Sequence, residues 1–180
     1  MIAIMRFIIA LVPALMLAAC VSEPRQSAPP PPPPAPIAPR PAPAPPPLAS
    51  NWEDWPVTPG TWAWRKDARG SVAMFGAAGT NALFVARCDK AVGAVFLSRS
   101  GTVSGAANLQ IRTSSALKQY GAQTNGDTPP YVAARLSPQD SGLDAIAYSR
   151  GRFVVTVSGM PDLVVPAWPE FTRVVEDCRG

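Results

Sequence analysis

The stretch Ala82-Leu83-Phe84-Val85-Ala86-Arg87-Cys88, followed by Asp89-Lys90 and by the run from Val92 to Arg99, decides the fold. The first run is apolar and continuous enough for a central β-strand, and the second run resumes the pattern after a short polar break. Two such runs joined by a short turn predict an antiparallel hairpin. We expect the rest of the folded part to add strands to this hairpin.

Short runs with the same strand character lie on both sides of the hairpin, bounded by turn-forming residues. The predicted strands are 71–75, 108–113, 116–120, 131–136, 152–157 and 163–165. Since Ser158-Gly159-Met160-Pro161 turns the chain, the last two strands are expected to form a second hairpin. The region from Gly121 to Pro130, with Asn125-Gly126-Asp127 and Pro129-Pro130, is expected to be a loop.

Two helices are expected. Ser137-Pro138-Gln139-Asp140 predicts a helix start, with a capping serine, a proline in the first helical position and an acid in the first turn, and this helix should end near Tyr148. Near the C-terminus, four apolar residues recur at the i, i+3, i+4, i+7 spacing of one helix face: Phe171, Val174, Val175 and Cys178. The predicted fold class is therefore mainly β, an antiparallel sandwich or small barrel with a short internal helix and a C-terminal amphipathic helix.

Four of the 5 tryptophans lie at the start of the folded part. Trp62 and Trp64 are two residues apart, so in a strand they point to the same face, and we expect them to pack in the core or on the sheet. A platform for a ligand is the alternative. Trp52 and Trp55 precede any clear periodicity, and Pro56 breaks the chain after them. These two are the tryptophans that we expect to contact a partner.

The N-terminal end has a different character. Arg6 precedes an apolar run from Phe7 to Ala19, which is shorter than the ~20 apolar residues of a membrane-crossing helix. Small residues close the run, which is the pattern of a secretory signal. The closing residues, Leu17-Ala18-Ala19-Cys20, resemble the lipobox of bacterial lipoproteins.

This resemblance implies that residues 1–19 are removed and that Cys20 becomes the acylated first residue of the mature chain. Several acyl chains would be needed, since a single chain binds membranes only marginally. Cleavage as an ordinary signal peptide, which leaves Cys20 as a free thiol, is the alternative. The resemblance implies a place in the cell envelope, and Val21 stands where an Asp would resemble an inner-membrane retention signal. We therefore expect the periplasmic face of the outer membrane.

A proline tract follows the cysteine. From Pro24 to Pro47 the chain holds 14 of its 23 prolines, which predicts an extended spacer that rises ~3.1 Å per residue. A proline-rich ligand for an aromatic groove is the alternative. The expected organisation is a signal at 1–19, a lipidated cysteine and disordered linker at 20–49, and one globular domain at 50–180.

The 3 cysteines fit the same interpretation. If Cys20 carries lipid, Cys88 and Cys178 remain as a pair, and an oxidising envelope favours joining them. The first ends the central strand and the second lies on the buried face of the last helix. Since the chain has no Cys-x-x-Cys, the pair is expected to be structural and not redox-active.

Composition excludes several classes of function. The chain has no histidine, so no Ser-His-Asp triad, Cys-His dyad or His-ligated zinc site can be built. The formal net charge is +4, but from Ser50 onward 13 Lys and Arg face 11 Asp and Glu and are scattered. Nucleic-acid binding needs clustered Lys and Arg. We therefore expect no nucleic-acid partner.

The sequence gives only weak signals for other kinds of catalytic site. Ser115 and Lys118 match the Ser-x-x-Lys pattern of penicillin-binding proteins and β-lactamases, but the companion Lys-Thr-Gly is missing and the chain is too short for that fold. Carboxylates on predicted helices could serve a glycosidase, although solvated helix faces look the same: Asp140, Asp144, Glu170 and Glu176. No catalytic residue, no metal ligand and no cofactor other than the lipid on Cys20 is predicted.

The C-terminal part carries a second resemblance. Tyr148 to Phe153, the second hairpin and a helix ending in Asp177-Cys178-Arg179 resemble small exported proteins of the invasion-associated locus B type. That family implies a disulfide-bearing β-sandwich without established catalysis, but its early cysteines are missing here, so no functional residue is carried over. We expect a non-enzymatic envelope module that binds an envelope protein or peptidoglycan. A cell-wall hydrolase and an inhibitor of a wall-degrading enzyme are the alternatives.

Overall fold

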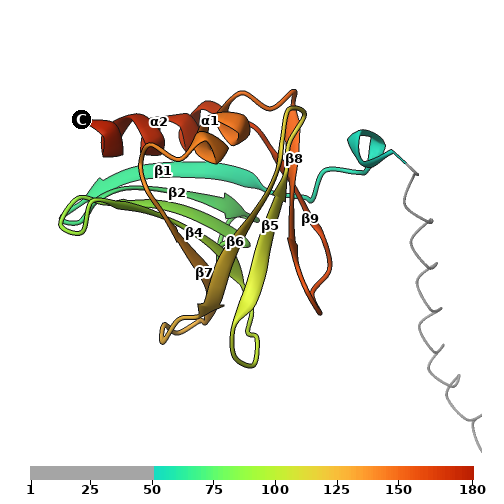
Figure 1. Cartoon of the computed structure of the whole chain (residues 1–180), viewed down its shortest axis with the longest axis horizontal. Coiled ribbons are helices and arrows are strands. Elements are labelled where there is room, and N and C mark those ends of the chain that lie inside the picture. The colour runs from blue at the N-terminus through green and yellow to red at the C-terminus, as the bar shows by residue number, and fades with distance from the viewer. Residues whose placement is uncertain (1–50) are drawn as a thin grey trace, which may run out of the picture. The chain divides into compact units, whose positions relative to one another are not determined.

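The computed structural model describes residues 51–180, so Cys20, the signal and the proline tract lie outside the described residues. This part of the chain forms one antiparallel sheet of nine strands with two α-helices and a 3-10 helix (Figure 1). The strands are β1 (Thr61–Asp67), β2 (Gly70–Gly76), β3 (Phe84–Asp89), β4 (Ala94–Ser100), β5 (Ala107–Arg112), β6 (Leu117–Thr124), β7 (Tyr131–Leu136), β8 (Arg152–Val157) and β9 (Leu163–Pro166). The helices are η1 (Trp52–Asp54), α1 (Ser141–Ala147) and α2 (Pro169–Arg179). The predicted fold class, mainly β with a short internal and a C-terminal helix, is confirmed.

The strand order is β1-β2-β3-β4-β7-β6-β5-β8-β9. The first four strands follow one another as hairpins, and the predicted hairpin of β3 and β4 is confirmed. The chain then runs on to β5, and the β5-β6-β7 meander returns so that β7 pairs with β4. The second predicted hairpin, formed by β8 and β9, adds to β5 at the far side of the sheet.

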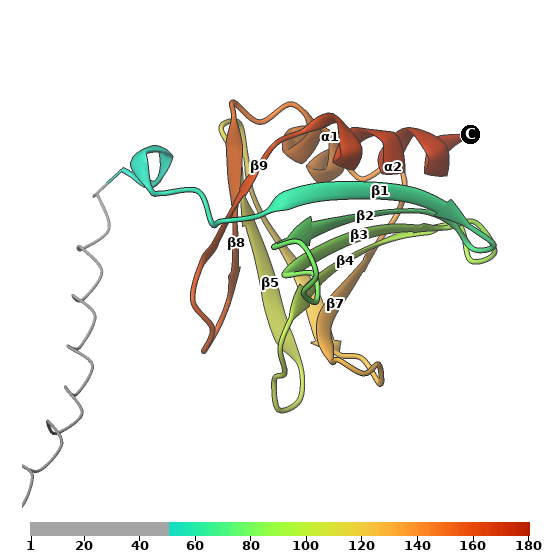
Figure 2. The same cartoon turned by 180° about the vertical axis from the view of Figure 1, so that it is seen from behind.

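The sheet curls into a half-barrel, so strands that are distant in the strand order face each other across the core (Figure 2). The rings of Phe84 on β3 and Phe153 on β8 lie 5.7 Å apart between centroids. The indole Nε1 of Trp62 on β1 donates a hydrogen bond to the carbonyl of Pro166 on β9, at 2.9 Å. The two edge strands are therefore tied to each other.

Aromatic side chains fill the core between the curled sheet and α2. Trp62, Phe75, Phe84, Phe153 and Phe171 form a chain of ring contacts with centroid distances from 5.6 to 6.4 Å. Each of these side chains is buried. Such tilted and edge-on pairs add to the free energy gained by burying their area.

The prediction that Trp62 and Trp64 share a face is confirmed. Trp62 is buried in the aromatic core, and Trp64 packs against the same core from β1. Arg173 of α2 lies over the Trp64 ring, with the guanidinium carbon 5.5 Å from the ring centroid. Both tryptophans therefore face the C-terminal helix.

Helix α2 has the predicted apolar face. Its buried residues are Phe171, Val174 and Val175, and Cys178 packs against the core beside them. The helix contacts β1 to β4, which is why it lies above these strands in Figure 1. Among the described residues, no helix combines the length and apolar character needed to cross a bilayer.

The prediction for the start of α1 was wrong. The helix begins at Ser141, and Asp140 caps it by accepting a hydrogen bond from the Gly142 N–H at 2.7 Å. Ser137 instead opens a turn, since the Asp140 N–H donates to its carbonyl at 3.0 Å. Aspartate and serine are both good caps, and the local sequence did not distinguish them. The helix ends at the predicted place, with Tyr148 as its C-cap.

The predicted loop from Gly121 to Pro130 was also partly wrong, because β6 continues to Thr124. Ala122 pairs with Ala107 on β5 and with Ala134 on β7, so the strand is held from both sides. This tertiary pairing outweighs the low strand propensity of Gly121. The loop itself is confined to the residues after Thr124.

A disulfide joins the central strand to the last helix. Cys88 at the end of β3 and Cys178 on α2 have their sulfur atoms 2.25 Å apart. This confirms the predicted pairing. The disulfide fixes the C-terminal helix α2 to β3, the strand of the predicted central hairpin.

The variant Cys178→Ser should lower the free energy of unfolding by roughly 4 to 5 kcal/mol, the value that the chain-entropy relation gives for a loop of this length. The two cysteines are separated by 90 residues. Urea unfolding of the oxidised protein and the variant measures the difference. On non-reducing gels, reduction should change the mobility of the natural chain and not that of the variant. Free thiols at both Cys88 and Cys178 in the native protein would contradict the prediction.

Candidate ligand-binding groove

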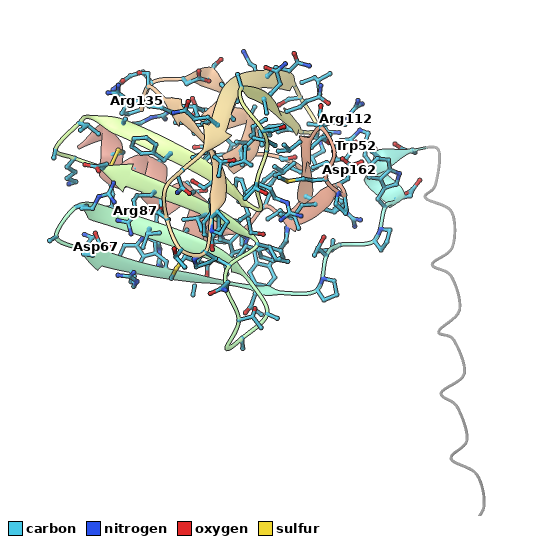
Figure 3. All side chains as sticks on the ribbon, turned by 90° about the horizontal axis from the view of Figure 1, so that it is seen from below. Trp52, Asp67, Arg87, Arg112, Arg135 and Asp162 are labelled. Carbon is cyan, nitrogen blue, oxygen red and sulfur yellow. A yellow bond between two sulfur atoms is a disulfide. The ribbon has the colours of Figure 1, made fainter. Side chains whose placement is uncertain are left out.

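A groove of about 790 Å³ lies on the sheet face that points away from α2. Successive side chains of a strand point to opposite faces. Ala73 and Phe75 of β2 face the core, so Val72 and Met74 face the groove. Figure 3 shows the molecule from the side of this face, with Arg87 and Arg135 labelled.

The strand register builds the floor of the groove in rows. In one row, Val72, Arg87, Phe96 and Arg135 lie side by side on β2, β3, β4 and β7. Neighbouring strands are ~4.8 Å apart, so the backbones of the two arginines lie about 10 Å apart with Phe96 between them. An aromatic ring is therefore flanked by two cations on one sheet face.

The next row holds apolar or small side chains on β2, β3, β4 and β7 and a glutamine on β6: Met74, Val85, Ser98, Ala133 and Gln123. Ser98 and Ala133 stand in the middle of this row, where small side chains leave space above the sheet. The floor of the groove is therefore largely apolar between its two ends.

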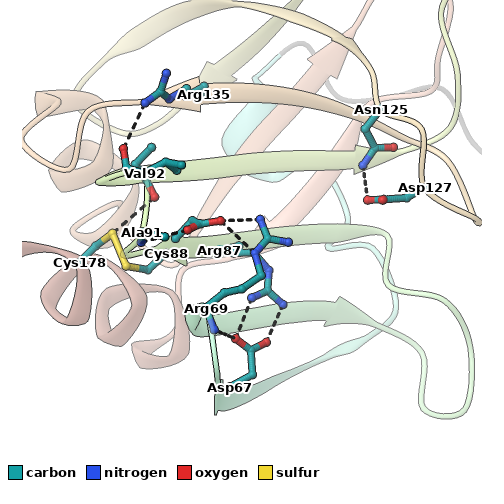
Figure 4. Close-up of polar contacts among 12 residues, drawn as sticks. Asp67, Arg69, Arg87, Cys88, Ala91, Val92, Asn125, Asp127, Arg135 and Cys178 are labelled. Atoms are coloured by element: carbon teal, nitrogen blue, oxygen red, sulfur yellow. Dashed lines mark hydrogen bonds and ion pairs between the residues drawn. A yellow bond between two sulfur atoms is a disulfide. The ribbon is translucent and has the colours of Figure 1, made fainter.

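Two ion pairs hold the arginine end of the groove (Figure 4). Arg87 donates from Nη1 to Oδ1 of Asp67 at 3.0 Å, and its Nη2 lies 2.9 Å from Oδ2 of the same carboxylate. Arg69 donates from Nε and Nη2 to Oδ2 of the buried Asp89, at 2.9 and 2.6 Å. The hydrogen bond from Arg87 is the main cause that lowers the pKa of Asp67 to about 2, and the bond from Arg69 lowers the pKa of Asp89.

Arg135 differs from these two arginines. Its Nη2 donates to the carbonyl of Val92 at 3.1 Å, and among the described residues it has no ion pair with a carboxylate. The side chain is exposed. Arg135 is therefore the cation of the groove whose charge the described part of the chain leaves uncompensated.

The opposite end of the groove is polar. The hydroxyl of Tyr131 donates to the carbonyl of Ala82 at 2.9 Å, so this side chain spans from β7 to the segment before β3. The amide of Asn125 accepts from the Tyr131 N–H at 2.8 Å and donates to Asp127 at 2.5 Å. Burial and the nearby charge of Asp127 raise the pKa of the Tyr131 hydroxyl. This end therefore presents a carboxylate and neutral polar groups.

Trp52 and Trp55, the predicted partner contacts, are half-buried and do not line the groove. Figure 3 labels Trp52 well away from Arg87. The most exposed tryptophan of the described chain is Trp168, at 43%.

The segment with Trp52 and Trp55 is fastened to the last two strands. Arg152 of β8 donates to the carbonyl of Trp55, and the Thr58 N–H donates to the carbonyl of Val164 on β9 at 3.0 Å. Val154 and Val164 are buried without belonging to the core cluster, so they lie on the outer face of these strands. This segment is a structural strap, and the sequence alone gave no signal for it.

Two of the four carboxylates considered for hydrolysis, Asp140 and Asp144, have structural partners. Asp140 caps α1 and accepts a hydrogen bond from the Tyr120 hydroxyl at 2.9 Å. Asp144 accepts two hydrogen bonds from Arg179, at 2.7 and 3.1 Å. Ser115 lies in the turn between β5 and β6, where its N–H donates to Thr113, and not on a helix. Within residues 51–180, no three Cys, Asp or Glu side chains gather as a metal site would require.

Sequence reasoning missed the residues of the groove. Arg87 interrupts an otherwise apolar strand, which was an available signal that its side chain leaves the core. Arg135 and Phe96 gave no such signal, because they become neighbours only through the pairing of β4 with β7.

Comparisons with family models, with curated proteins and with solved structures find no match to this chain. The groove is therefore interpreted from its own geometry and charge. The two resemblances stated from the sequence remain predictions.

The pairing of Asp67 with Arg87 predicts a specific dependence of stability on pH. The pKa of Asp67 is about 2 in the folded chain, against the ordinary value of 3.8. A lowered pKa stabilises the fold above the ordinary value, and this contribution is lost as the pH falls from about 4 toward 2. Asp67→Asn should therefore be less stable than the natural chain at pH 6 and should lose less stability between pH 4 and pH 2.

Urea unfolding at a series of pH values measures this effect. Asp54→Asn is the matched control, since Asp54 is exposed and has no ion pair among the described residues. It should follow the pH dependence of the natural chain. The same pH dependence in Asp67→Asn would show that the ion pair with Arg87 adds nothing to the fold.

Proposed function

We propose that this protein is a lipid-anchored, non-catalytic binding module of the bacterial cell envelope, which holds its ligand in the groove between Arg135 and Asp127. The observation that carries the proposal is the groove itself: an apolar floor, an uncompensated cation at one end and a carboxylate at the other. Its volume of about 790 Å³ lies within the range of ligand pockets, ~300 to 1,000 Å³. At the predicted location in the cell envelope, the proposed partner is an envelope protein or peptidoglycan.

The address rests on the lipobox-like residues that end at Cys20. A lipid on this cysteine would tether the chain to the periplasmic face of the outer membrane. If the stretch from Pro24 to Pro47 is extended, it would hold the domain up to roughly 75 Å from the bilayer. That reach gives an anchored domain access to partners well beyond the membrane surface.

A binding role fits the groove better than hydrolysis does. Of the residues that line the groove, Asp127 is the one carboxylate. The usual glycosidase mechanism needs two carboxyl groups on either side of the scissile bond. Histidine, the usual general base at neutral pH, is absent from the sequence. The groove offers the means to hold and orient a ligand without an acid and base pair to cleave it.

Lipid anchoring is tested at Cys20. The variant Cys20→Ser should move from the membrane to the soluble envelope fraction and should lose incorporation of a labelled fatty acid, because the acyl chains have no other attachment site. Ser27→Ala, in the same part of the chain, should behave as the natural sequence does. A Cys20→Ser protein that still sediments with membranes would overturn the predicted address.

The absence of catalysis is tested with peptidoglycan. The purified full chain, kept in mild detergent and incubated with isolated sacculi, should release no soluble fragments over many hours. A parallel sample with added muramidase shows that the sacculi can be degraded. Fragments released by the protein alone would contradict the binding role and support the hydrolase alternative.

A further inference from the structure

From the two unlike ends of the groove we infer that its ligand is the short peptide stem of peptidoglycan. The stem's carboxylates would lie at Arg87 and Arg135, and its free amino group would lie at Asp127. This inference rests on the proposed binding function and names the ligand of the same groove.

The arginine end has hydrogen-bond donors to spare. A guanidinium carries five N–H groups. Arg87 uses two of its nitrogens to hold Asp67, while Arg135 makes one bond, to the Val92 carbonyl. Arginine pairs with carboxylates through two parallel hydrogen bonds. A ligand carboxylate above Phe96 can therefore meet free N–H groups from both sides.

Charge favours an anionic ligand at this end. Asp67 and Asp89 neutralise Arg87 and Arg69, so the net positive charge comes from Arg135. At the other end of the groove, Asp127 is the one carboxylate among the lining residues. A ligand with a carboxylate at one end and an amino group at the other complements this lining.

The length of the groove favours a short peptide. The row of Phe96 and the row of Tyr131 are separated by four residues along β4, because Phe96 pairs with Arg135 and Ser100 pairs with Tyr131. At ~3.4 Å per residue the rows are about 14 Å apart. An extended peptide of about four residues spans this distance. Its methyl groups would lie on Val85 and the other apolar side chains of the floor.

The polar far end argues against a fatty acid. An acyl chain with its carboxylate at Arg135 would bury its tail against Asn125 and Asp127, and burying polar groups without partners costs free energy. The C-terminal segment of another protein is a second alternative ligand. It would bring one terminal carboxylate but no amino group at a fixed distance from it. A peptidoglycan stem carries several carboxylates and, on its third residue, one amino group within a few residues of one another.

The experiment titrates a synthetic N-acetylated stem tetrapeptide, with lysine at its third position, into the purified full chain in mild detergent, followed by calorimetry. Saturable binding is expected. Arg135→Gln should weaken it at least tenfold, and amidation of the terminal D-alanine carboxylate should weaken it similarly on the natural chain. Arg112→Gln is the matched control, since Arg112 is also an exposed strand arginine but does not line the groove. It should leave the affinity unchanged.

The amino group is tested separately. Asp127→Asn should weaken binding of the stem severalfold, and the same substitution should have no effect on a stem whose lysine amine is acetylated. Because this comparison changes the ligand as well as the protein, a general disturbance of the fold cannot reproduce it. An equal effect of Asp127→Asn on both stems would overturn the assignment of the amino group.

Three further results would overturn the inference: no saturable binding of the stem, equal binding of an all-L tetrapeptide of matched charge, or tighter binding of palmitate. The second would identify a protein tail as the ligand and the third a lipid. None of these results affects the membrane-anchoring test at Cys20. Failure of the proposed ligand can therefore be distinguished from failure of the proposed localisation. If Arg135→Gln lowers the thermal midpoint of unfolding, its weaker binding could come from a disturbed fold. The weaker binding of the amidated stem to the natural chain is then the test of the carboxylate contact.

Discussion

The fold depends on the hydrogen bond and ring contacts through which Trp62 ties the two edges of a curled sheet together. Its indole reaches the carbonyl of Pro166 on β9, and its ring lies against Phe75, Phe84 and Phe171. Inside the curl that this contact closes, Phe153 on β8 packs opposite Phe84 on β3. The curl encloses the aromatic core on one face of β2 to β4, and the same curvature leaves the groove on the other.

One strand therefore serves two purposes. On β3, Phe84, Ala86 and Cys88 point into the core, while Val85 and Arg87 line the groove. The disulfide fixes the end of this strand to α2, and Asp67 on β1 holds the Arg87 guanidinium. Because this cation on β3 is held by a carboxylate on β1, its donors are already oriented, which would reduce the ordering cost of the proposed binding.

Much of the fold could be predicted from local patterns. The limits of β7 and β8, both hairpins, the apolar face of α2 and the cysteine pair all follow from periodicity and composition. The groove could not be predicted, because the row of Arg87, Phe96 and Arg135 exists only through the pairing of β4 with β7, which are not consecutive strands. Gly121 misled the strand prediction, since the pairing of β6 with β5 and β7 outweighed the low strand propensity of this glycine.

The strap before β1 has a mechanical consequence. Any pull on the chain from its N-terminal side reaches the domain first at the hydrogen bonds between Thr58 and Val164 and at the contact of Arg152 with Trp55. Through these bonds, the pulling force acts on β9 at the edge of the sheet. In the strand order this edge lies at the opposite end from β2, β3 and β4. In the proposed tethered protein, tension would therefore act on β8 and β9 before it acts on the strands that line the groove.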